Sequence, residues 1–184
     1  MAENLELFLR FAEGCRCYLE DTRTISQKDN DAIKSGRPGN DVIKRVFYMA
    51  HPELEQLSRS MRKSIFDESV LMRFYCFEHN KMMHEQGHFA CMCFPGTIVG
   101  RMNDEYVIEL EPIDTALRIN AKGLGLQHGD WVLVHRMNIV ENIDHKLAKE
   151  AIDYLKRLGM DKHLKFPPET IKYMAELKDK YGIL

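Results

Sequence analysis

Apolar side chains recur every three or four residues through most of the first half of the chain, which is the spacing of amphipathic helices. Pro52 separates two of these patterns, because the residue before a proline is pushed out of the helical conformation. Gly87 is placed to stop the last one. The first 90 residues are therefore predicted to form a bundle of four or five helices, at about residues 5–19, 27–34, 41–51, 52–61 and 67–86.

The pattern changes after Cys91 to short runs rich in β-branched residues, separated by turn-forming pairs such as Asn103-Asp104. Five strands within about 50 residues favour a small closed or nearly closed β-barrel, since a sandwich needs more strands. Helices are expected again after Asp144 and after Pro167-Pro168. The predicted strands cover residues 97–102, 105–110, 115–120, 131–135 and 137–143.

These elements predict an α+β protein with three parts. A helical domain covers residues 1–90 and a β-barrel covers residues 91–143. C-terminal helices at residues 144–184 are expected to pack on the barrel or on the bundle. A chain of 184 residues is long enough for one large core or two modest ones.

Charge and hydropathy narrow the class of protein. The net charge of −2 is spread evenly over the two halves, so neither half resembles a basic arm for nucleic acid. The N-terminus carries acidic residues where a signal peptide needs basic ones, and no apolar run approaches the roughly 18 residues that span a bilayer. We therefore expect a cytoplasmic protein without membrane contact, whose five cysteines are free thiols.

Two runs of residues carry a family resemblance. The run Cys91-Met-Cys-Phe-Pro95-Gly96 and the later run Gly129-Asp-Trp-Val-Leu-Val-His135 reproduce, in order and spacing, motifs of the HypC/HupF family of hydrogenase-maturation chaperones. With the closing helix from Asp144, the resemblance covers about residues 91–158. In the family the cysteine follows the initiator methionine, whereas here it is internal.

The resemblance implies a fold and a role. The family is similar to a five-stranded OB-type barrel with a tail helix, and its members bind an assembly factor and a hydrogenase subunit. By this resemblance Cys91 would engage a partner or hold a metal fragment, Pro95 and Gly96 would form the turn that presents it, and His135 would be the matching histidine. The chain is thus expected to be a non-enzymatic accessory protein for metallocentre assembly.

Further thiol and imidazole groups gather on both sides of the predicted domain boundary. They are ligands that zinc and iron accept, and His84 and His88 would share a helical face if the helix continues past Gly87. The spacing matches no standard zinc module, so exposed histidines and buried small thiols remain the plain alternative. The candidate metal ligands, for iron or zinc, are Cys91, Cys93, His88 and His84.

Three alternative functions stay open at this point. A protein-interaction module would keep the barrel but bury its cysteines. A cysteine-dependent enzyme could pair Cys91 with His135, although no phosphate loop, nucleophile elbow or dinucleotide fingerprint is present. An OB-type nucleic-acid binder would use Phe94, Tyr106 and Trp131 for stacking, but acidic residues outnumber basic ones around them.

Overall fold

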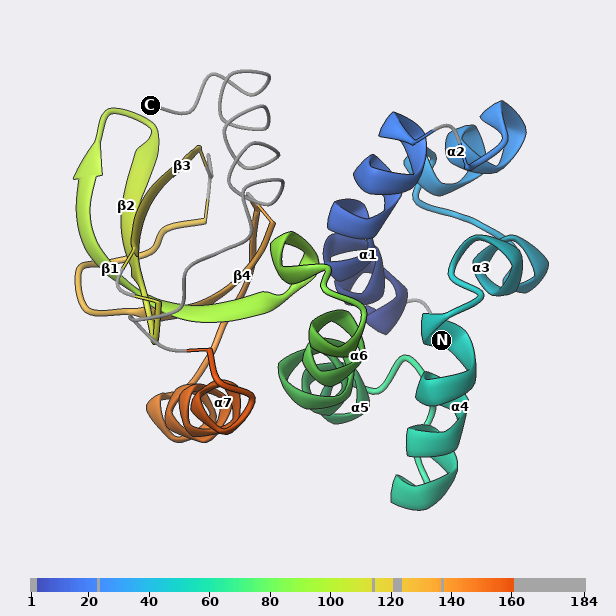
Figure 1. Ribbon diagram of the computed structural model, residues 1–184. Helices are drawn as coiled ribbons and strands as arrows, with labels where there is room; N and C mark the ends of the chain where they lie inside the picture. The colour runs from blue at the N-terminus through green and yellow to red at the C-terminus, as the bar shows by residue number, and fades with distance from the viewer. Residues whose placement is uncertain (1–2, 23, 114, 121–123, 137, 161–184) are drawn as a thin grey trace. The chain divides into compact units, whose positions relative to one another are not determined.

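The computed structural model describes residues 3–22, 24–113, 115–120, 124–136 and 138–160. The chain divides between His79 and Asn80 into two compact units, here called the helical unit and the sheet unit (Figure 1). The sequence placed this boundary after residue 90. The predicted helix that follows Pro167-Pro168 lies outside the described residues. Within them, no helix combines the length and apolar character needed to cross a membrane.

Helices form in every stretch of residues 1–90 that was predicted to be helical, but the break expected at Pro52 lies instead between Val46 and Ala50, and Pro52 belongs to the first turn of the next helix. Ser26 begins the second helix by accepting a hydrogen bond from the Asp29 amide at 3.1 Å, and Asp67 begins the fifth by accepting one from the Ser69 amide at 3.0 Å. The helices are α1 (Glu3–Asp21), α2 (Gln27–Lys34), α3 (Asn40–Val46), α4 (Ala50–Met61) and α5 (Glu68–Arg73).

The predicted regular helix over residues 67–86 is interrupted. A π-helical turn, η1 (Phe74–Glu78), lies between α5 and α6 (His79–Glu85), and the His79 amide donates to the Phe74 carbonyl five residues back. A π turn holds one residue more than an α turn, so it rotates everything that follows. Gly87, with a φ of +72°, ends the helical stretch as predicted.

The core of the helical unit is rich in aromatic rings. Phe8 packs edge-on against Phe47 with ring centroids 5.4 Å apart, and Phe11 stacks on Tyr75 at 4.1 Å. The apolar spacing of the sequence predicted a buried face of Leu5, Phe8, Leu9, Ala12, Cys15 and Leu19, and this is partly wrong. Leu5, Leu9 and Leu19 are only half-buried, and the buried stripe is Leu7, Phe8, Phe11 and Ala12.

A two-point ion pair joins α2 to α3. Arg45 donates from Nε and Nη2 to the two carboxylate oxygens of Asp29, at 3.0 and 2.6 Å. This pairing with the guanidinium lowers the pKa of Asp29 from 3.8 to about 2. The short polar helix α2 is thus tied to its neighbour by charge as well as by its buried Ile33.

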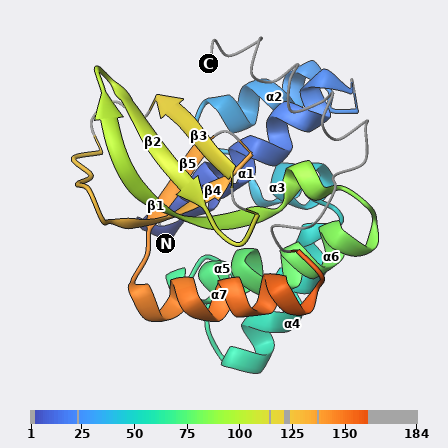
Figure 2. The same cartoon turned by 60° about the vertical axis from the view of Figure 1, so that its left-hand side comes forward.

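The sheet unit is built on five antiparallel strands in the order β3-β2-β1-β4-β5 (Figure 2). Asn103, with a φ of +58°, forms the predicted turn between the first two strands. Helix α7 (His145–Arg157), capped by Asp144, packs beside β1 and β4. The strands are β1 (Cys93–Met102), β2 (Glu105–Leu110), β3 (Thr115–Asn120), β4 (Trp131–His135) and β5 (Asn138–Asn142).

The sheet is open, whereas the sequence predicted a barrel that is closed or nearly so. Strands β3 and β5 form its two edges, and within the described residues they share no hydrogen-bonded ladder. Some of their Cα atoms nevertheless lie within 8 Å of each other. Strong twist and curling bring the edges together without pairing them.

Candidate functional site

The Cys91 segment is a tight turn that runs directly into β1. The 3₁₀ turn η2 (Phe89–Cys91) ends where the Met92 amide donates to the Phe89 carbonyl at 3.1 Å. Cys91 is 7% exposed and Cys93 is completely buried. Both cysteines therefore lie against the protein interior, not on a presented loop.

Pro95 and Gly96 lie inside β1, so the turn expected for them is wrong. Both residues pair with β4, and the Pro95 carbonyl also accepts a hydrogen bond from the Glu111 amide at 3.0 Å. A Cβ on Gly96 would lie 2.6 Å from a methyl of Ile108 on β2. This glycine is needed because β2 passes too close for any side chain.

The register of β1 and β4 decides which cysteine meets which histidine. Cys93 lies opposite His135, and the next pair along is Phe94 with Val134. Because residues directly opposite share a face of the sheet, Cys93 and His135 are cross-strand neighbours. The Cys91–His135 pair considered from the sequence is not the one that this register makes.

The polar partner of Cys91 is Arg136, which directly follows β4. Its Nη1 donates to the Cys91 sulfur at 3.9 Å, and Arg136 adopts the left-handed conformation with a φ of +55°. Burial raises the pKa of the Cys91 thiol, and the positive guanidinium opposes that rise only in part. The thiol is therefore protonated at neutral pH.

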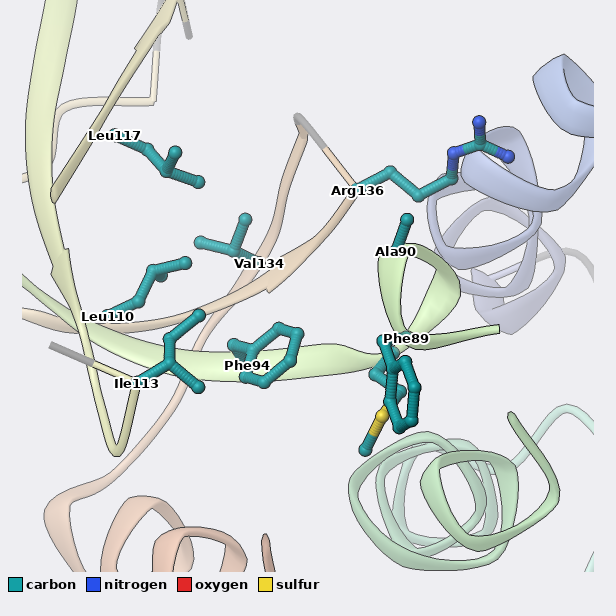
Figure 3. A pocket seen from close by; sticks show the side chains of 9 residues that line it. Phe89, Ala90, Phe94, Leu110, Ile113, Leu117, Val134 and Arg136 are labelled. Atoms are coloured by element: carbon teal, nitrogen blue, oxygen red, sulfur yellow. The ribbon is translucent and has the colours of Figure 1, made fainter. Parts of the chain in front are cut away.

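An apolar cavity of about 30 Å³ opens beside this segment (Figure 3). Phe89 and Ala90 line one end, and Arg136 lies at the rim with its guanidinium directed away from the lining. One water molecule requires roughly 10–15 Å³ of such a cavity, so the space accommodates only a few atoms. Its remaining walls are Met92, Phe94, Leu110, Ile113, Leu117 and Val134.

Asn80, which the sequence analysis did not single out, holds the start of β1. The Cys93 amide donates to Asn80 Oδ1 at 2.7 Å, and Asn80 Nδ2 donates to the Cys93 carbonyl at 2.8 Å. Strand β2 pairs with β1 only from Gly96 onward. The carboxamide thus takes the place of a strand at Cys93 and joins the first residue of the sheet unit to β1.

The four predicted metal ligands do not converge. His84 is half-buried with its ring 5.5 Å from that of Phe89, while His88 is exposed. Among the described residues, no group of three Cys, His, Asp or Glu ligand atoms within 4.8 Å of one another includes any of the four. The helix ends at Gly87, so the shared helical face assumed for His84 and His88 is not formed.

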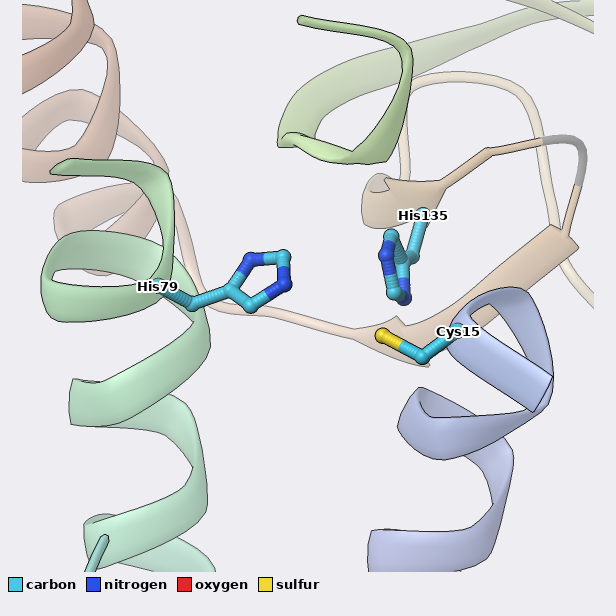
Figure 4. A group of neighbouring side chains, drawn as sticks. All are labelled: Cys15, His79 and His135. Atoms are coloured by element: carbon cyan, nitrogen blue, oxygen red, sulfur yellow. The ribbon is translucent and has the colours of Figure 1, made fainter. Parts of the chain in front are cut away.

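A Cys–His pair that sequence reasoning missed lies inside the helical unit. Cys15 on α1 and His79 at the start of α6 direct their side chains toward each other (Figure 4). The Cys15 sulfur and a ring nitrogen of His79 lie within 4.8 Å. The two residues are 64 positions apart in the sequence, so no local spacing could have revealed the pair. His135, drawn in the same figure, belongs to the sheet unit.

The chemistry available around β1 is thus a buried neutral thiol, a buried guanidinium and a small apolar cavity. These groups can bind a partner's apolar side chain in the cavity and a hydrogen-bond acceptor at the guanidinium. They are less suited to nucleophilic attack, because the thiol is neutral. No family model matches the chain, and no curated protein or solved structure matches it. The proposal below therefore depends on the residues and on their geometry.

Proposed function

We propose that this protein is a HypC/HupF-like accessory protein that binds a protein partner through its sheet unit during assembly of a metal centre of the hydrogenase type. One observation carries the proposal. The two motif runs, which lie more than 30 residues apart in the sequence, form neighbouring strands in continuous register from Cys93 opposite His135 to Thr97 opposite Trp131. This pairing brings both motif runs into one part of the sheet, as a shared role would require.

Partner binding is favoured over catalysis by the state of Cys91. A nucleophile works as the thiolate, and burial holds this sulfur in its protonated form. The neighbours of Cys91 on both sides, Ala90 and Met92, line the apolar cavity. We assign the segment from Phe89 to Phe94 a recognition role, in which a partner's apolar side chain enters the cavity.

The shape of the sheet supports the same assignment. An OB-type barrel is a five-stranded, partly open sheet, and here the two edge strands β3 and β5 approach each other. Closure between these edges would complete the barrel of the resembled family. Partner binding that brings β3 and β5 into one ladder would also remove two exposed strand edges.

A second function is favoured by one specific contact. The guanidinium of Arg136 lies 3.9 Å from the Cys91 sulfur, and a neighbouring positive charge stabilises a thiolate. If partner binding exposes the turn, Cys91 can lose its proton and hold an iron-containing fragment. The position of Arg136 is then what makes this cysteine, and not Cys93, the metal-holding group.

The experiment is a binding measurement between the full-length protein and a purified precursor of a hydrogenase large subunit, with both proteins prepared without oxygen. The variants are Cys91→Ala and, as a matched control, Cys76→Ala, which removes another buried thiol, this one from the helical unit. Wild type and Cys76→Ala should bind with equal affinity. Absence of binding by the wild-type protein would refute the proposed function.

The same samples separate the two candidate roles of Cys91. If it only shapes the docking surface, Cys91→Ala binds more weakly and no preparation contains stoichiometric metal. If it holds a fragment, wild-type protein carries iron that Cys91→Ala lacks. Melting temperatures of both variants show whether a loss reflects the site or a general loss of stability.

A further inference from the structure

We infer that Cys15 and His79 form a binding site for a thiophilic metal ion such as Zn²⁺ within the helical unit. The Cys15 sulfur and a His79 ring nitrogen lie within 4.8 Å, close enough for one ion to bridge them after small side-chain rotations (Figure 4). Neither residue belongs to the ligand set predicted from the sequence. The site also shares no residue with the proposed function of Cys91, so each can fail alone.

The packing of the two helices brings these residues together. One helical turn earlier, Phe11 of α1 stacks on Tyr75 with ring planes 4° apart. Cys15 follows Phe11 by four residues, and His79 follows Tyr75 by four, so both pairs lie on the facing sides of the same two helices. The Tyr75 and His79 rings are also in contact, with centroids 5.2 Å apart. The aromatic stack thus brings the two residues to the same level of the packed helices.

The π-helical turn aims His79 at α1. Its hydrogen bond from the His79 amide to the Phe74 carbonyl spans five residues instead of four. A π turn holds one residue more than an α turn, so it changes the direction of the residues that follow it. Single π turns within helices are uncommon and recur at functional sites. Here the turn places a histidine, only 1% exposed, beside a cysteine.

Thiolate and imidazole nitrogen are the two side-chain ligands that zinc prefers. Cys15 is half-exposed, which gives an ion a route to the pair, while the buried His79 supplies a fixed second ligand. Binding breaks the S–H bond of Cys15, forms a metal–sulfur bond and releases one proton to solvent. Two ligands from this unit leave coordination positions for water or another donor, so the ion is exchangeable.

The test is a titration of metal-free, reduced full-length protein with Co²⁺, which reports a thiolate ligand through a charge-transfer absorption band. One Co²⁺ per chain should bind with this band, and Zn²⁺ should abolish it. Cys15→Ser and His79→Gln should each weaken binding by about tenfold or more, which is about 1.4 kcal/mol. Cys76→Ala, the matched control, removes another thiol of the helical unit and should bind like the wild type.

Two results would overturn the site: a wild-type protein without the band, or a band that survives in Cys15→Ser. Far-ultraviolet circular dichroism checks that the variants fold. If a variant does not fold, a second measurement on the wild-type protein tests the site without any substitution. Zn²⁺ should slow alkylation of Cys15, followed by mass spectrometry of its peptide, and an unchanged rate would also reject the site.

Discussion

Replacing Asn80 by alanine tests how the first strand is held. The carboxamide exchanges two hydrogen bonds with the backbone of Cys93, at 2.7 and 2.8 Å, and both residues are completely buried. Alanine removes both partners at once. The amide and the carbonyl of Cys93 would then stay buried without the hydrogen-bond partners that Asn80 provides.

The magnitude follows from these two groups. A buried backbone group that loses its partner costs about 1–3 kcal/mol, so Asn80→Ala should lower the free energy of unfolding by about 2–6 kcal/mol. Water that enters the space left by the side chain would bring the loss toward the lower figure. Since small domains are stable by about 5–15 kcal/mol, the effect is large enough to measure and can approach complete unfolding.

The assay is urea unfolding followed by circular dichroism, with the loss taken from the midpoint at constant slope. Asn142→Ala is the control, because that asparagine is exposed at the end of β5 and should cost less than about 0.5 kcal/mol. Hydrogen exchange at the Cys93 amide should also accelerate in Asn80→Ala. A loss below about 1 kcal/mol with an unchanged slope would refute the assigned role of Asn80.

Three further predictions concern backbone space, charge and capping. Gly96→Ala should lower the free energy of unfolding by about 1–3 kcal/mol, because the new Cβ would clash with β2. At Gly100 the nearest atom to an added Cβ is 3.8 Å away, so Gly100→Ala should be tolerated. Equal losses for the two variants in urea unfolding would contradict this. The depressed pKa of Asp29 means that its pairing with Arg45 stabilises the fold above pH 3.8 and that this contribution is lost as the pH falls toward about 2. Asp29→Asn should therefore flatten the acid side of the stability profile, and an unchanged profile would argue against the ion pair. Asp144→Ala removes the N-cap of α7 and should lower the free energy of unfolding by about 1 kcal/mol, measured by thermal unfolding. An unchanged melting curve would contradict this prediction.

Local patterns in the sequence determined most of the secondary structure. Strands β2, β3 and β4 begin and end at the predicted residues, and α2 does the same. These elements are short and bounded by turn residues, so local propensity and side-chain alternation are sufficient. The sequence also identified the two runs, around Cys91 and before His135, that become neighbouring strands.

Only the tertiary structure decided which side chains meet. Strand register places Cys93 opposite His135, while Cys91, in the turn before β1, contacts Arg136, which follows β4 in the left-handed conformation. The sheet unit begins at Asn80, whose carboxamide binds the backbone of β1 13 residues later, a contact that no local pattern predicts. The pairing of Cys15 with His79 depends on a π turn and on packing between distant helices, and neither leaves a periodic signal in the sequence.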